Sequence, residues 1–216
     1  MPKRQEKCAY CGIDGVSIER EHVIPRCLYP ASRKVSSVQR ITVPACGPCN
    51  RSWSADEAHF RSMVVLAGKA NILVQELWET KVTRSLDRPD GAHQARELFE
   101  HIEPVTVDGQ DRYMIYPGRD ERVLRVARKI VRGLSHFHKV ESALSDERVK
   151  AEVVTYEIPD DVLNSGTLYT HEPGVLWYWH KKFDDEEPMS VWILTFFDRL
   201  TFAARVDAPT ERAEPS

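Results

Sequence analysis

The stretch Glu21-His22-Val23-Ile24-Pro25 lies between two C-x-x-C pairs, and the second pair is followed directly by Asn50 and Arg51. The four cysteines of the two pairs are Cys8, Cys11, Cys46 and Cys49. Four thiols in two close pairs are typical of a structural zinc site, a tetrahedral all-sulfur cage with no open position. Such a cage would tie together the two ends of a segment that holds an acid and an imidazole, with an amide directly beyond it.

The composition is that of an ordinary globular chain. The 216 residues are 42% hydrophobic and 29% charged, which suits one large domain or a small module plus a second domain. No apolar run reaches the roughly 18–20 residues that a membrane span needs, and no apolar signal core follows the charged start. The sequence therefore predicts a cytoplasmic protein with no membrane partner.

The formal net charge of -3 hides an asymmetry. Residues 1–53 carry nine Lys or Arg and four Asp or Glu, a net charge of +5, which leaves -8 for the rest of the chain. The positive end is the end that carries the motif, as phosphate binding requires. A solvated basic surface would give the same counts.

Two other interpretations of the cysteines are not favoured. A zinc deaminase needs His-x-Glu with an open metal position, whereas here Glu21 precedes His22 and Ala45 separates Pro44 from Cys46. A redox C-x-x-C is not expected, because zinc would occupy both pairs. The fifth cysteine, Cys27, is predicted to be a small buried residue.

The N-terminal part reads as a hairpin followed by a helix. Residues 16–22 and 41–43 are predicted strands, the second ended by Pro44, with a loop between them. Ser54 and Glu57 match a capping box that opens a helix running to about residue 84.

The C-terminal part reads as antiparallel strands with helices. A break at residues 88–92 is the predicted linker, which divides the chain into 1–87, 88–206 and a disordered tail at 207–216. Helices are expected at about 92–102 and 117–139, a hairpin at 105–116, and strands at 151–158, 175–181, 191–197 and 200–206.

One face of the helix at 117–139 carries a basic row at spacings of three and four residues. Its members are Arg122, Arg125, Lys129, Arg132 and His136. Such a row is more often a solvated face than a contact with nucleic acid, and the acidity of the surrounding region favours the solvated face.

In the order C-x-x-C, Glu-His-Val-Ile-Pro, C-x-x-C-Asn, the first quarter of the chain resembles the HNH endonucleases, a family of ββα-metal nucleases. The resemblance implies an α+β protein in which a zinc-stapled ββα-metal (HNH) module precedes a C-terminal domain of antiparallel strands and helices. It also implies a hydrolase that cuts DNA phosphodiester bonds with the help of a divalent cation.

The family's roles can be carried over to matching positions. The resemblance implies that His22 activates water and that Glu21 and Asn50 bind a catalytic cation, for which oxygen ligands favour Mg²⁺. An imidazole with an ordinary pKa can accept a proton at cellular pH. Arg26 and Arg51 are candidates for holding a substrate phosphate. The third cation ligand stays open, with residues Ser54, Asp56 and His59 as candidates.

Family members act in restriction, phage defence and mobile elements, with DNA as the partner. The compact size of the chain and the absence of a helicase, ATPase or guide-binding motif suggest that another subunit supplies the specificity. The alternative is a zinc module that binds nucleic acid or a partner protein without cutting. In that interpretation Glu21 and His22 are a surface pair with no chemistry.

Overall fold

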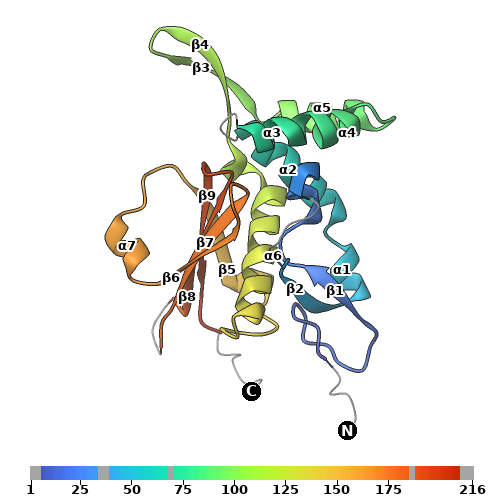
Figure 1. The fold of residues 1–216 in the computed structure, drawn as a ribbon, viewed down its shortest axis with the longest axis vertical. Coiled ribbons are helices and arrows are strands. Elements are labelled where there is room, and N and C mark those ends of the chain that lie inside the picture. The colour runs from blue at the N-terminus through green and yellow to red at the C-terminus, as the bar shows by residue number, and fades with distance from the viewer. Residues whose placement is uncertain (1–5, 34–38, 68–70, 185–187, 210–216) are drawn as a thin grey trace, which may run out of the picture.

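A computed structural model describes residues 6–33, 39–67, 71–184 and 188–209. It confirms a mixture of helices and antiparallel sheets. In Figure 1, helix α6 (Glu121–Phe137) stands between a five-stranded sheet and the N-terminal hairpin with its helices. Within the described ranges, no helix has both the length and the apolar character needed to cross a membrane.

The N-terminal hairpin joins β1 (Ile18–His22) and β2 (Thr42–Cys46) in antiparallel register. Pro44 was predicted to end the second strand, and this is wrong, because β2 continues through it and pairs it with Arg20. Hydrogen-bonded and non-hydrogen-bonded pairs alternate, and Val23 N donates to Ile41 O, so Pro44 falls on a non-hydrogen-bonded pair. Its missing N–H therefore costs the ladder nothing.

Two helices follow β2 directly, α1 (Gly47–Arg51) and α2 (Ser54–Ala67). The predicted capping box does not form: the Ser54 hydroxyl donates to the Arg51 carbonyl, and the Glu57 carboxylate binds Lys129. The rest of the predicted long helix is divided into shorter pieces. These are α3 (Ile72–Leu77), a π-helical turn (Trp78–Val82) and α4 (Thr83–Leu86).

A second hairpin projects from the body of the molecule after α5 (Gly91–Phe99) (Figure 1). Its strands are β3 (Ile102–Val107) and β4 (Gln110–Ile115), as the sequence predicted. The turn residues Asp108 and Gly109 have φ of 52° and 72°. These two positive values are the ones that a tight two-residue hairpin turn needs.

The C-terminal sheet has the order β5-β9-β8-β7-β6, with every neighbouring pair antiparallel. Its strands are β5 (Val149–Val154), β6 (Thr167–Glu172), β7 (Leu176–Lys182), β8 (Ser190–Phe196) and β9 (Leu200–Val206). Four of them overlap predicted strands, whereas β6 was not predicted and follows a short helix, α7 (Asp160–Asn164). Residues 210–216 of the predicted tail lie outside the described residues.

Helix α6 contacts the sheet on one side and the hairpin on the other. Its apolar stripe is buried except at Phe137, and the buried part packs in one core that also contains residues of the first hairpin. At Gly133 an added Cβ would lie 2.9 Å from Val23 and 3.0 Å from the Tyr10 hydroxyl. The glycine therefore lets the helix approach the hairpin closely.

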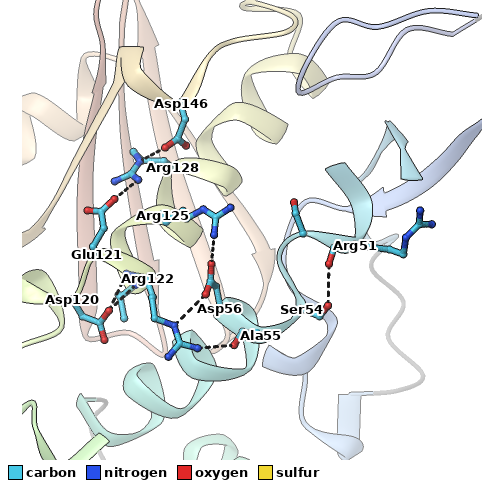
Figure 2. A network of polar contacts seen from close by, with 12 residues as sticks. Arg51, Ser54, Ala55, Asp56, Asp120, Glu121, Arg122, Arg125, Arg128 and Asp146 are labelled. Atoms are coloured by element: carbon cyan, nitrogen blue, oxygen red, sulfur yellow. Dashed lines mark hydrogen bonds and ion pairs between the residues drawn. The ribbon is translucent and has the colours of Figure 1, made fainter. Parts of the chain in front are cut away.

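The basic row of α6 faces the N-terminal part of the chain, and the expectation of a solvated face is wrong. Arg122 and Arg125 both bind the Asp56 carboxylate of α2, at 3.1 and 2.6 Å (Figure 2). Arg132 is buried and donates to the carbonyls of Leu144 and Tyr10. The row thus holds the two parts of the chain together.

Lys129 is the most buried member of this row, with no exposed surface. Its ammonium donates to Glu21 Oε1 at 2.5 Å, Glu57 Oε1 at 2.7 Å and the His22 carbonyl at 2.9 Å. An ammonium has three N–H donors, so three oxygens satisfy it fully. Helix α6 is therefore bound to the strand that carries the motif.

Removing the Lys129 ammonium should destabilise the fold strongly, since it leaves two carboxylates facing each other in the interior. We expect Lys129→Met to lower the free energy of unfolding by about 3–5 kcal/mol. Arg205→Met is the control, because Arg205 pairs with Asp207 at an exposed site and should cost less than about 1 kcal/mol. Equal denaturant midpoints for the two variants would contradict the role given to Lys129.

Candidate functional site

The four predicted zinc ligands converge. All four sulfur atoms, those of Cys8, Cys11, Cys46 and Cys49, lie within 4.8 Å of one another. Cys8 and Cys11 come from the turn before β1, where Gly12 has a φ of 73°, while Cys46 ends β2 and Cys49 lies in α1. The cluster therefore connects the start of the chain to the junction of β2 and α1, and it could hold a metal ion such as zinc.

The electrostatics of the cluster favour a bound cation. Burial raises the pKa of Cys8, but backbone amides of Cys11, Cys46 and Tyr10 outweigh it and lower this pKa to about 6. Burial and the neighbouring sulfurs raise the pKa of Cys49. Cys8 therefore loses its proton readily, whereas deprotonation of Cys49 is disfavoured by burial and by the neighbouring sulfurs. A divalent cation at the centre of the cluster would stabilise all four thiolates.

Cys27 does not belong to the cluster, as predicted from the sequence. Its thiol donates to the Glu57 carbonyl at 3.3 Å. Burial, followed by the charge of Glu57, raises its pKa to about 11. Cys27 is therefore an unreactive thiol next to α2.

His22 lies at the end of β1 and is half-buried. Burial lowers its pKa, and the positive charges of Arg26, Arg40 and Lys129 lower it further, against a smaller opposite effect of Glu57. The imidazole is therefore neutral near neutral pH and can accept a proton. Arg26 is exposed, while Arg40 is half-buried with its guanidinium 4.1 Å from the centre of the Tyr29 ring.

Glu21 is buried, and its carboxylate is bound to the Lys129 ammonium. Burial raises its pKa, and the charge of Lys129 and the hydrogen bond from it oppose that effect. The same ammonium binds Glu57 of α2, so three groups from β1, α2 and α6 meet at one point.

Asn50 and Arg51 contact Glu19 rather than Glu21. The Asn50 side-chain amide donates to Glu19 Oε2, and Arg51 lies 3.4 Å from Glu19 Oε1. Glu19 is exposed and precedes Glu21 on β1 by two residues, so the structure pairs the two predicted cation ligands with different partners.

The three candidates for a third cation ligand also have other partners. Ser54 is exposed and bonds to the Arg51 carbonyl, and Asp56 is held between Arg122 and Arg125. His59 contacts Asp120, at the start of α6. Neither Glu21 nor His22 belongs to a group of three His, Cys, Asp or Glu ligands within the described part of the chain.

Sequence reasoning missed the groups that surround the motif. Lys129 and Glu57 were assigned to a solvated row and a helix cap, and Glu19 and Arg40 were not singled out. One feature of the sequence could have indicated that Lys129 is buried. Lys129 lies three residues after Val126 and directly before Ile130, so it borders the apolar face of α6.

Comparisons of the chain with protein-family models, with curated proteins and with solved structures found no match in any of the three. The class supported by the fold and the site is therefore a mixed helix-and-sheet protein with a four-cysteine cluster that could hold a metal ion.

Metal removal should distinguish the cluster from Cys27. In the folded protein we expect a thiol reagent to modify four cysteines after chelation, and none of these four before it, because metal coordination blocks the thiolates. Cys27 is half-buried rather than fully buried as predicted, and it should react more slowly than the freed cluster thiols because its pKa is raised. Mass spectrometry of labelled peptides is the measurement, and rapid labelling of Cys8 or Cys46 in unchelated protein would contradict a metal-bound cluster.

Proposed function

We propose that the protein is an endonuclease that hydrolyses DNA phosphodiester bonds, with His22 as the general base. The observation that carries the proposal is the setting of His22: a half-buried imidazole with a lowered pKa, near the charges of Arg26 and Arg40. This imidazole ends the first strand of a hairpin whose other strand runs into the four-cysteine cluster and a helix. The layout supports the ββα-metal module that the motif implies.

The residues around His22 suit the chemistry of phosphodiester hydrolysis. A neutral imidazole can take the proton of an attacking water at physiological pH. Negative charge accumulates on the phosphate as the water attacks, and the guanidinium groups of Arg26 and Arg40 can neutralise it. Arg51 could hold a further phosphate only by releasing Glu19.

The catalytic Mg²⁺ implied by the resemblance has no ready site at Glu21 and Asn50. The Glu21 carboxylate is bound by an ammonium at 2.5 Å, and the Asn50 amide is turned to Glu19. Magnesium dependence therefore requires Glu21 to release Lys129 and Asn50 to turn from Glu19. The roles of His22 as base and of the arginines in binding the substrate phosphate do not require these two changes.

A second candidate function is a zinc module that binds nucleic acid or a partner protein without cutting. The Glu21–Lys129 ion pair favours it, since this pair gives Glu21 a structural role. In the nuclease, and in a zinc module that binds nucleic acid, the basic N-terminal segment contacts the phosphate backbone. A role in restriction, phage defence or a mobile element, and a second subunit for specificity, belong to the nuclease proposal alone.

The proposal is tested by nicking of supercoiled DNA, with and without Mg²⁺. We expect His22→Ala to lower the rate by about 10²–10⁴-fold, the usual contribution of a general base. His93→Ala is the matched control, because His93 is an exposed histidine of α5 whose loss should leave the rate unchanged. Equal nicking by wild type and His22→Ala removes His22 from the mechanism, and DNA binding without cleavage under any condition supports the second candidate.

Arg26 should contribute to DNA binding through one phosphate. We expect Arg26→Ala to weaken binding to all DNA sequences equally and to reduce the slope of log K against log salt concentration by about 1. Arg205→Ala, which removes an exposed arginine of β9 in the C-terminal sheet, should change neither quantity. The measurement is a fluorescence anisotropy titration at several salt concentrations, and an unchanged slope for Arg26→Ala excludes this contact.

A further inference from the structure

A second cluster of potential metal ligands lies away from the four cysteines. His59, His101 and Asp120 place one side-chain nitrogen or oxygen each within 4.8 Å of the other two. They come from three separate elements: α2, the turn between α5 and β3, and the residue that caps α6. His59 and Asp120 are buried, and His101 is half-buried.

The contacts meet at one oxygen atom. Asp120 Oδ2 lies 2.5 Å from His59 Nε2 and 3.0 Å from His101 Nε2. The other oxygen, Oδ1, accepts hydrogen bonds from the backbone amides of Arg122 and Val123 and so caps α6 (Figure 2 shows Asp120 at the start of this helix). The cap fixes the carboxylate, and Oδ2 is directed at the two imidazoles.

The ligand set identifies the kind of ion. Two imidazole nitrogens and one carboxylate oxygen are the donors that Zn²⁺ and other divalent transition metals prefer, whereas Mg²⁺ prefers oxygen alone. Both histidines contact Asp120 Oδ2 through the same nitrogen, Nε2, so the three ligand atoms lie close enough together to share one ion. Without a metal, His59 Nε2 is hydrogen-bonded to Asp120 Oδ2, and His101 Nε2 contacts the same oxygen. A bound ion would replace these contacts with metal–ligand bonds of about 2.0–2.2 Å.

A cavity adjoins one member of the cluster. It has a volume of about 350 Å³ and is lined by His59, Ser62 and His93, but not by His101 or Asp120. Arg122 also lines this cavity, but its guanidinium is bound to Asp56 and Glu97, so its charge is compensated. Three protein ligands leave coordination positions open for water or a small anion, as in zinc sites that are not purely structural.

We propose that His59, His101 and Asp120 form a second metal site, which binds a divalent transition-metal ion such as Zn²⁺ with an open coordination position. The site joins α2, α5–β3 and the start of α6, and it is separate from the four-cysteine cluster. Of its residues only His59 was a candidate ligand of the catalytic cation, and the structure places it against Asp120 instead.

The test is the zinc content of the full chain, measured by inductively coupled plasma mass spectrometry after equilibration with Zn²⁺ and gel filtration. We expect two ions per chain, one for each cluster. His101→Gln and Asp120→Asn should each retain one ion. Asparagine caps a helix as well as aspartate does, so Asp120→Asn keeps α6 while weakening the site.

The matched control is His93→Gln, which removes a histidine from the wall of the same cavity but outside the cluster, and which should retain both ions. The cysteine-bound ion reports folding in every variant. One ion in the wild type, or two ions in both His101→Gln and Asp120→Asn, would overturn the proposal.

A cobalt titration of the wild type tests for the second metal site without any variant. Cobalt bound by thiolates gives a strong sulfur-to-metal charge-transfer band, and cobalt bound by imidazole and carboxylate gives only weak d–d bands. We expect a second equivalent that adds d–d intensity with no further charge transfer. Saturation after one thiolate-bound equivalent would refute the second site.

Discussion

The structure depends on the burial of one ammonium group. Placing Lys129 in the interior would be costly unless its charge were compensated, and the compensation comes from Glu21, Glu57 and the His22 carbonyl. Each of these oxygens belongs to the N-terminal part of the chain, whereas Lys129 belongs to α6. The need to satisfy one charge therefore fixes the helix against the motif-bearing strand.

The same constraint explains how a small hairpin can keep a fixed shape. A two-stranded hairpin such as β1–β2 is marginal alone in water. Here a cysteine cluster that could hold a metal ion connects its start to the junction with α1, and α6 covers it closely at Gly133. Because the His22 carbonyl is itself bound by Lys129, the strand end that carries the imidazole is held by the core as well as by the cysteines.

Local patterns predicted what is local in this chain. Cysteine spacing gave the four-thiol cluster, and Asp108-Gly109 gave a hairpin turn, because both depend on residues close in sequence or on one shared ion. Partners distant in sequence could not be predicted: Lys129 lies 108 residues from Glu21, and a charged row reads alike whether it faces water or buried carboxylates. Strand β6 was missed because it is largely exposed, with polar residues at both faces.

Helix α6 also sets the relation between the two polar centres. Asp120 precedes Lys129 by nine positions, and at 1.5 Å per residue this is roughly 13–14 Å along the helix axis. The His59–His101–Asp120 cluster and the Lys129 centre beside His22 are thus separate places on one rigid element, each with a partner on α2, His59 for one and Glu57 for the other. A movement of α6 against α2 would have to break the His59–Asp120 and the Glu57–Lys129 contacts at the same time. The two helices therefore form one rigid support for the strand that carries the motif.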